Sequence, residues 1–210
     1  MSTTDHAALL EAAREAVALA SGVCRQVQQA LEQVRSITKD DKSPVTVADF
    51  ASQAIVARVL RERLGDDRLI RLVAEEDSAA IRDNDKRAHL EAVVEAVGHA
   101  FDGITMNEVL EAIDLGNAEP ASDGFWTLDP IDGTKGFLRG QQYAVSLGWI
   151  EHGEPIVGAL GCPNLALDFG APLDEADGAG SLYLAIKGEG LYELPGSGEG
   201  SATKVTRLPK

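Results

Sequence analysis

The sequence predicts an α+β fold in which helices pack on an antiparallel sheet. Apolar residues in the first third of the chain recur at three- and four-residue steps, which is the period of a helix. From Tyr143 onward the apolar residues alternate with small or polar ones, which is the period of a strand. Helices followed by hairpin-linked strands favour a helical layer on one sheet rather than alternating βαβ units.

Four helices are expected from helical spacing and from start and stop signals, over residues 5–36, 47–64, 86–100 and 105–115. Gly65 is a suitable stop for the second helix, and Thr105 with Glu108 forms the pattern of a capping box at the start of the last. The charged, irregular residues 38–43 predict a loop between the first two helices.

Strands are expected where short apolar or alternating runs are bounded by turn residues, at 69–74, 125–128, 143–150, 155–160, 181–186 and 191–194. With 210 residues, of which 44% are hydrophobic, the chain is long enough for one well-packed domain. We assign this domain to residues 1–195 and expect the Gly- and Ser-rich residues 196–210 to form a flexible tail.

Composition excludes several classes of function. The formal net charge of −15 repels nucleic acid, so a nucleic-acid partner is not expected. No apolar run approaches about 18 residues, and the N-terminus lacks the order of a signal peptide, so neither a membrane span nor export is expected. Two distant cysteines, Cys24 and Cys162, fit free thiols in a reducing cytoplasm.

The segment Trp126-Thr127-Leu128-Asp129-Pro130-Ile131-Asp132-Gly133-Thr134-Lys135-Gly136-Phe137 is the strongest sign of function. Asp129 and Asp132 can bind one hard divalent cation, because Pro130 stiffens the link between them. Gly133 lets the backbone approach an anion closely, and Thr134 offers a hydroxyl and an N–H to the same anion. This combination is typical of a site for a metal ion and a phosphate.

Two further segments carry acids at an expected strand end or helix start. They are Ser43-Pro44-Val45-Thr46-Val47-Ala48-Asp49 and Val73-Ala74-Glu75-Glu76-Asp77. All three segments also have an ordinary structural interpretation. Asp49 could be an acid favoured by the dipole at a helix start. The segment with Glu75 could be a solvated turn, and the segment with Asp129 could be an ordinary turn.

Together the three segments resemble the lithium-sensitive, magnesium-dependent phosphatase superfamily that includes inositol monophosphatase. Residues 43–49 and 129–137 are most similar to the 3′(2′),5′-bisphosphate nucleotidases, because inositol monophosphatases usually carry another pair at Lys135-Gly136. Residues 142–147 and 161–164 resemble the same branch. The similarity extends from about residue 5 to about residue 195, and it implies the fold of the N-terminal domain of that superfamily.

The resemblance implies a set of metal ligands, and roughly two or three Mg²⁺ ions with inhibition by Li⁺. It makes Glu75 a metal ligand, Asp129 a bridge between two ions, Asp132 a ligand of the second ion, and the carbonyl of Ile131 a further ligand. Oxygen ligands suit Mg²⁺ better than Zn²⁺.

The resemblance also implies which residues act on the substrate. Asp49, assisted by Thr134, would orient and activate the attacking water, and the N–H groups of Gly133 and Thr134 would hold the scissile phosphate. The implied reaction removes the 3′-phosphate of 3′-phosphoadenosine 5′-phosphate to give AMP and phosphate.

The chain departs from the resemblance in length. Members of the superfamily continue into an α/β domain that supplies a further metal-binding aspartate in a Trp-Asp segment, and this chain contains no Trp-Asp. We therefore expect a site short of one carboxylate, and an exposed apolar face that favours self-association. The alternatives to a bisphosphate nucleotidase are a phosphatase acting on inositol phosphates or other small sugar phosphates, and a truncated, non-catalytic remnant that binds metal or phosphate.

Overall fold

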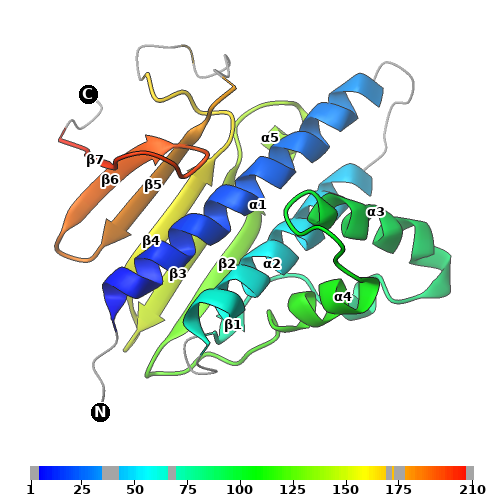
Figure 1. Cartoon of the computed structure of the whole chain (residues 1–210), viewed down its shortest axis with the longest axis horizontal. Helices are drawn as coiled ribbons and strands as arrows, with labels where there is room; N and C mark the ends of the chain where they lie inside the picture. Colours follow the sequence, from blue (N-terminus) through cyan, green and yellow to red (C-terminus); the bar gives the residue numbers. More distant parts are fainter. Residues whose placement is uncertain (1–4, 35–42, 66–69, 169–171, 173–177, 207–210) are drawn as a thin grey trace.

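The computed structural model describes residues 5–34, 43–65, 70–168, 172 and 178–206. Helices cover one face of a single seven-stranded sheet whose spatial order follows the sequence, β1-β2-β3-β4-β5-β6-β7 (Figure 1). The predicted α+β class is confirmed. Within the described part of the chain, no helix is both long and apolar enough to cross a lipid bilayer.

The longest helices, α1 (His6–Val34) and α2 (Ser43–Leu64), lie side by side across the sheet. The first agrees with the prediction, whereas α2 begins four residues earlier than expected. Pro44 is compatible with this early start. Proline lacks a backbone N–H, but the N–H groups of the first helical turn have no acceptor within the helix, so no hydrogen bond is lost. The predicted loop at 38–43 lies almost wholly outside the described residues.

Two smaller helices, α3 (Arg87–Gly98) and α4 (Met106–Asp114), pack against α2 beyond the edge of the sheet. The capping box at the start of α4 is present: the N–H of Glu108 donates to Thr105 Oγ1 at 3.3 Å, and the N–H of Thr105 donates to Glu108 Oε2 at 2.8 Å. Short 3₁₀ turns at Ser78–Ala80 and Asn84–Lys86 lead from β1 to α3.

The central strands of the sheet are β2 (Phe125–Asp132), β3 (Ala144–Glu151), β4 (Glu154–Cys162) and β5 (Ser181–Ile186), joined as antiparallel neighbours. The period of two after Tyr143 is confirmed, since Val145, Leu147 and Trp149 are buried while their neighbours are not. The buried Trp126 and Trp149 meet edge to face, with 5.3 Å between their ring centroids.

Strand β1 (Leu72–Val73) departs from the predicted sheet in two ways. It has two residues instead of the expected six, and it runs parallel to β2, with Leu72 opposite Trp126 and Val73 opposite Thr127. Its other edge is bonded to the chain after α4: Ala74 N–H donates to the Gly116 carbonyl at 2.9 Å, and Ala118 N–H donates to the Leu72 carbonyl at 3.1 Å. The acidic residues Glu75 and Glu76 therefore follow a strand that is hydrogen-bonded along both of its edges.

The sheet continues past residue 195, where the sequence suggested a flexible tail. Strand β6 (Gly190–Pro195) pairs with β7 (Thr203–Lys204), so residues 203–204 add a short seventh strand. Tyr192 lies opposite Lys204 in this pairing, and the ammonium of Lys204 lies 5.7 Å from its ring centroid. Part of the expected tail is therefore paired with the sheet at Thr203 and Lys204.

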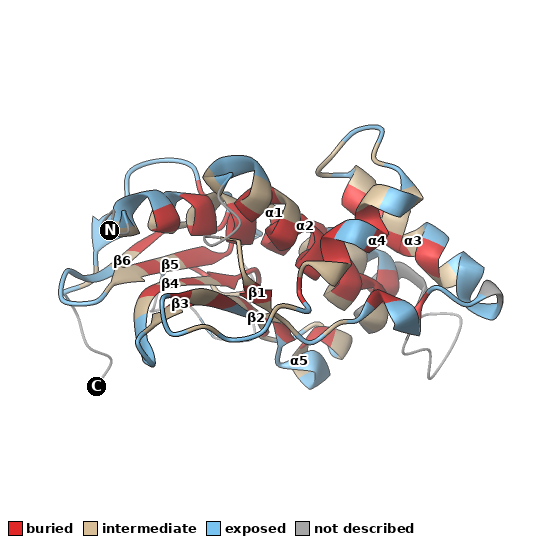
Figure 2. Cartoon of the chain, turned by 90° about the horizontal axis from the view of Figure 1, so that it is seen from below, coloured by how far each residue is buried: buried red, intermediate tan, exposed pale blue. Residues whose placement is uncertain are grey.

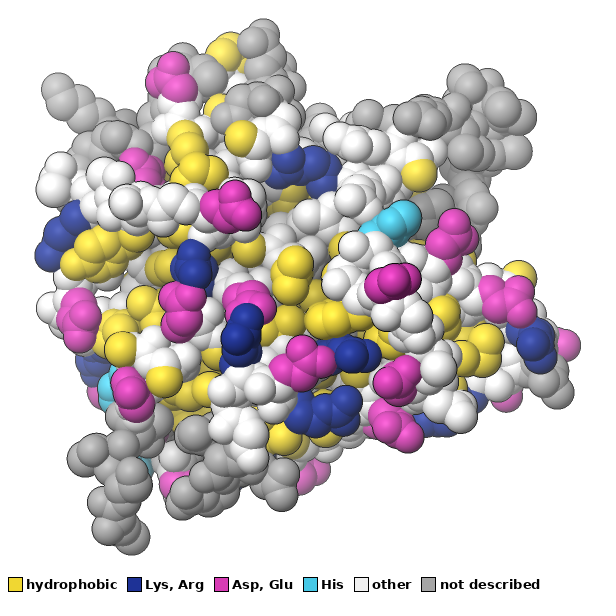
Figure 3. Space-filling view, in the orientation of Figure 1, with side chains coloured by type: hydrophobic (Ala, Val, Ile, Leu, Met, Phe, Trp, Pro, Cys, Tyr) yellow, Lys and Arg dark blue, Asp and Glu magenta, His cyan; other side chains and the backbone are white. Residues whose placement is uncertain are grey.

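The two faces of the sheet differ. Helices α1 and α2 bury one face, whereas the opposite face carries only the short α5 (Thr134–Leu138) at its margin among the described elements (Figure 2). A shallow hollow on that open face is lined by Thr127, Asp129, Ser146, Ile150, Leu160 and Tyr183. On the helical side of the molecule, acidic and basic side chains are interspersed rather than gathered into one patch (Figure 3).

Candidate metal and phosphate site

The three acid-bearing segments singled out in the sequence meet at one end of the sheet. Strands β1 and β2 run parallel, so their carboxyl ends lie at the same edge. The pairing ends at Val73 with Thr127, two residues before Glu75 and Asp129, and the charge of Glu75 acts on Asp129. The N-terminal half of α2 supplies Asp49 to the same region, where its charge interacts with Glu75, Glu76 and Asp129.

Helix α2 holds both strand ends in place through two fully buried polar side chains. Ser52 donates its hydroxyl to the Pro130 carbonyl at 3.1 Å, within the Asp129–Asp132 segment. Gln53 bonds both backbone groups of Glu76, accepting its N–H at 2.9 Å and donating to its carbonyl at 2.6 Å. Because Ser52 and Gln53 follow Asp49 by three and four residues, they lie on the same face of the helix.

The end of β2 is irregular, and this irregularity shapes the loop. The pairing of β2 with β3 shifts between Asp129 and Asp132, and the N–H of Ile131 donates to Asp129 Oδ1 at 3.2 Å. Gly133 then turns the chain with a φ of 94°, a left-handed value that favours glycine, and α5 begins at Thr134. The hydroxyl of Thr134 lies 3.5 Å from the Ile131 carbonyl oxygen, so both oxygens lie on the same side of the loop.

The carboxyl groups of the cluster raise the pKa values of one another. Burial, followed by the charges of Glu76, Asp129 and Glu75, raises the pKa of Asp49 to about 8. The pKa of Asp129 is raised by burial, then by Glu75 and Asp132, although the Ile131 N–H acts in the opposite direction. Burial and the neighbouring Glu75 raise the pKa of Glu76. Among the described residues, no Lys, Arg or His is a cause of these three shifts, and a bound cation would relieve the repulsion between the carboxylates.

The donor set fits a hard divalent cation. Carboxylates surround the site, together with the Ile131 carbonyl and the Thr134 hydroxyl, and oxygen ligands are those that Mg²⁺ prefers. Among the described residues, however, no three Asp, Glu, His or Cys side chains converge closely enough to hold an ion. The carboxylates therefore interact through their charges but are too far apart to coordinate one ion together. Their side chains would have to move closer when an ion binds.

The structure gathers the predicted residues but gives them different exposures. Asp49 and Asp129 are half-buried, Ile131 is buried, and Glu75, Asp132, Gly133 and Thr134 are exposed. The hydrogen bonds between described residues include none from Thr134 to Asp49; the Thr134 hydroxyl instead points to Ile131.

Sequence reasoning missed three residues of this region. Glu76 is half-buried and is the first of the neighbouring charges that act on Asp49, although only Glu75 was expected to take part. Ser52 and Gln53 carried no functional signal in the sequence. Their spacing of three and four residues from Asp49 could have suggested that they share its helical face.

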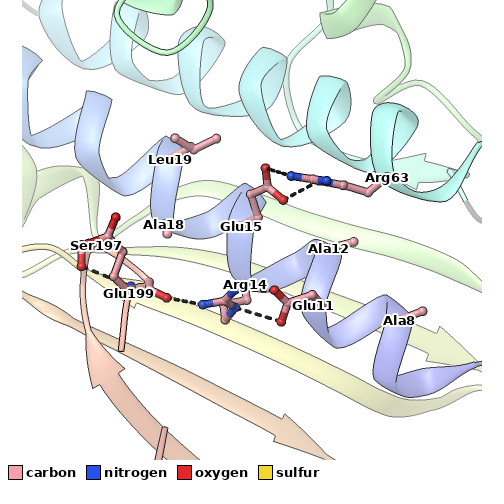
Figure 4. Close-up of a pocket in the computed structure, with 11 residues that line it drawn as sticks. Ala8, Glu11, Ala12, Arg14, Glu15, Ala18, Leu19, Arg63, Ser197 and Glu199 are labelled. Atoms are coloured by element: carbon pink, nitrogen blue, oxygen red, sulfur yellow. Dashed lines mark hydrogen bonds and ion pairs between the residues drawn. The ribbon is translucent and has the colours of Figure 1, made fainter. Parts of the chain in front are cut away.

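A second hollow lies far from these acids, on the outer face of α1 (Figure 4). Both arginines that line it, Arg14 and Arg63, are hydrogen-bonded within the chain. Arg63 makes two bonds to the Glu15 carboxylate, at 2.5 and 2.7 Å, and Arg14 binds Glu11 and the Gly198 carbonyl. None of the predicted site residues lines this hollow, so it is separate from the candidate site.

Comparison with known proteins identifies the family of the chain. The family described as "Inositol monophosphatase family" matches residues 5–204, nearly the whole chain. The chain therefore belongs to the inositol monophosphatase family.

Among curated relatives, 3′(2′),5′-bisphosphate nucleotidase 1 of Arabidopsis thaliana is 43% identical over 209 residues, which cover 93% of this chain and 59% of the relative. The 3′(2′),5′-bisphosphate nucleotidase of Schizosaccharomyces pombe is 40% identical over 193 residues, covering 88% and 53%. The chain thus spans little more than half the length of these relatives.

Solved structures support the fold. An inositol monophosphatase from Anabaena matches with a TM-score of 0.51 and 19% identity, covering 90% of this chain and 48% of that one. Mycobacterium tuberculosis SuhB matches with a TM-score of 0.50 and 22% identity, covering 91% and 49%. At these identities the similarity supports the architecture alone.

Proposed function

We propose that this chain carries the metal- and phosphate-binding part of a Mg²⁺-dependent bisphosphate nucleotidase. Its reaction would be hydrolysis of 3′-phosphoadenosine 5′-phosphate to AMP and inorganic phosphate. The observation that supports this most strongly is the mutual charge interaction of Asp49, Glu75 and Asp129, which come from three separate segments. The relatives named as bisphosphate nucleotidases support the choice of substrate.

In this proposal Glu75, Asp129, Asp132 and the Ile131 carbonyl hold the ions. When bound, Mg²⁺ would neutralise the phosphate and lower the pKa of water. Asp129 is the central ligand, since the charge of Glu75, two residues after β1, and that of Asp132, at the end of β2, both act on it.

The remaining residues act on the substrate. Asp49 would orient the attacking water and accept its proton, once bound cations lower a pKa that stands at about 8 in their absence. Thr134 would assist Asp49, and the N–H groups of Gly133 and Thr134 would donate to the phosphate. The water oxygen would bond to phosphorus as the bond between phosphorus and the 3′ oxygen breaks; the 3′ oxygen takes a proton from solvent, and inorganic phosphate leaves.

The test is phosphate release from 3′-phosphoadenosine 5′-phosphate by the 210-residue chain, with Mg²⁺ or with EDTA. We expect release that needs Mg²⁺ and is lost in Asp129→Asn. Inositol monophosphate serves as the comparison substrate. Equal rates on both would overturn the substrate assignment while leaving the phosphatase chemistry intact, and no Mg²⁺-dependent release on either would overturn the activity.

Self-association remains a prediction. The open face of the sheet presents Ile150, Leu160 and Leu191 around its shallow hollow, and the side chain of Leu191 is 41% exposed. We propose that two copies of the chain associate through this face. Light scattering coupled to gel filtration would test it, and a monomer at all concentrations would contradict it.

A further inference from the structure

One turn of α2 brings the three acidic segments into a common frame. Asp49, Ser52 and Gln53 occupy positions i, i+3 and i+4 of the helix. Asp49 is itself one of the site acids, whereas the other two side chains are fully buried and bond backbone groups of the other two segments. A single helical face is therefore connected to every part of the candidate site.

The Gln53 amide takes the place of a neighbouring strand for the residues after β1. Backbone pairing with β2 ends at Val73, and Ala74 bonds Gly116 on the other side. At Glu76 both backbone groups are bonded by Gln53 instead, and the same amide nitrogen also donates to the Ile113 carbonyl at 2.8 Å. The amide thereby uses both donors and its acceptor in a site closed to water.

The surroundings of Gln53 leave little freedom. A Cβ placed on Gly116 would lie 2.4 Å from the Gln53 amide nitrogen and 3.1 Å from the Ala74 Cβ. Only a residue without a side chain allows the amide, the end of α4 and the end of β1 to meet this closely.

The Ser52 hydroxyl has the corresponding role for the second segment. It bonds the carbonyl of Pro130, between Asp129 and the Ile131 carbonyl, at the point where β2 loses regular pairing with β3. Where the regular hydrogen bonding between β2 and β3 stops, this hydroxyl links the Asp129–Asp132 segment directly to α2.

We infer that Gln53 and Ser52 are positioning residues that fix the Glu75–Glu76 and Asp129–Asp132 segments relative to Asp49, and so set the affinity of the site for a divalent cation. The inference rests on the proposed function for the identity of the ligand. The positioning itself does not need it, because the bonds exist in the chain without metal.

A buried glutamine can instead serve only to satisfy backbone groups, and the chain offers a matched example. Gln28, on α1, donates to the Phe137 carbonyl at 2.8 Å and accepts from the Asn164 amide at 2.8 Å, with 4% exposure. Phe137 is the fourth residue of α5, five positions after Asp132, so Gln28 bonds the far end of that helix rather than Glu76 or Pro130. Gln28→Met therefore removes buried bonds as Gln53→Met does, while the bonds from α2 to Glu76 and Pro130 remain.

The experiment compares the full wild-type chain with Gln53→Met, Gln28→Met, Ser52→Ala and Ser52→Thr. Mn²⁺ binding is measured by electron paramagnetic resonance, and amide hydrogen exchange is measured in EDTA. We expect Gln53→Met to weaken Mn²⁺ binding by at least about tenfold and Gln28→Met by less than about twofold. We also expect Ser52→Ala to weaken binding and Ser52→Thr, which keeps the hydroxyl, to restore it.

Equal weakening in Gln53→Met and Gln28→Met, or unchanged affinity in Gln53→Met, would overturn the inference. Should Gln53→Met not fold, the Ser52 pair decides, and equal affinities in the alanine and threonine variants would overturn it. A wild-type chain that binds no Mn²⁺ would refute the metal site and with it the proposed function. Hydrogen exchange then decides separately: faster exchange at Ala74 in Gln53→Met but not in Gln28→Met supports positioning, and unchanged exchange refutes it.

Discussion

Replacing Asp49 with asparagine is expected to stabilise the metal-free chain, and to do so more strongly as the pH rises. Asp49 has a pKa of about 8 in the folded chain against 3.8 for an unperturbed aspartate, because burial and the charges of Glu76, Asp129 and Glu75 oppose its ionisation. The folded state thus binds this proton more tightly than the unfolded state. The free energy of unfolding therefore falls as the pH rises from about 4 to about 8, and then levels off.

The size of the effect follows from the same shift. Linkage sets a limit of about 1.4 kcal/mol for each pH unit within this window. Water and counterions reach a half-buried cluster and reduce that limit, so we expect Asp49→Asn to gain about 2 kcal/mol over the wild type between pH 5 and pH 8. Asparagine keeps the shape of the side chain and removes only the charge.

The assay is urea unfolding in EDTA at several pH values, followed by the fluorescence of the buried Trp126 and Trp149. Asp102→Asn, in the exposed turn after α3, is the control and should differ from the wild type by a constant amount. A gain in Asp49→Asn that does not change with pH would refute the reasoning, since it would show that Asp49 carries no ionisation penalty. Excess Mg²⁺ should remove the advantage of the variant, because the cation stabilises the ionised wild-type site.

Three further variants test other parts of the molecule. Glu75→Gln should weaken Mn²⁺ binding while changing the free energy of unfolding by less than about 0.5 kcal/mol, because its side chain is exposed; a large drop in melting temperature with affinity intact would contradict this. Gly136→Ala would place a Cβ 1.9 Å from the Gln142 carbonyl oxygen and should cost at least about 2 kcal/mol in urea unfolding, whereas Gly22→Ala in α1, where a Cβ meets nothing within 4 Å, should stabilise by about 0.5–1 kcal/mol. Trp126→Ala should cost about 3–5 kcal/mol by the same method, because this fully buried ring also packs on Trp149, and a loss below about 1 kcal/mol would show that the core repacks.

Elements whose pattern is repeated over several residues could be predicted from the sequence. Helix α1 buries Leu9, Ala13 and Val17 on the predicted stripe, and the capping box of α4 is a local motif that depends on no distant residue. Strand β3 alternates buried and less buried residues from Ala144 to Ile150.

Strand β1 could not be predicted in the same way. Two residues carry no period, and its parallel pairing with β2 depends on a partner more than fifty positions away in the sequence. Direction matters here, because only the parallel arrangement brings the carboxyl ends of β1 and β2 together.

The candidate site was predictable where acids stand in an unusual local order, as at Asp129 and Asp132. The residues that support them were not, because a serine or glutamine in a helix is ordinarily a surface residue. Ser52 and Gln53 are buried because they bond backbone groups of Pro130 and Glu76. These partners are distant in the sequence, so the sequence does not show the reason for the burial.

The compactness of this framework within α2 limits how the chain can change length. Asp49 and Gln53 are separated by four residues, about 6 Å along the helix axis, in a helix of 22 residues. Inserting one residue between them would turn Asp49 by about 100° away from the face that carries Gln53. Between Gln53 and Leu64 the same helix can gain or lose residues without changing the relative positions of Asp49, Ser52 and Gln53. Insertions should therefore be harmful before Gln53 and tolerated after it.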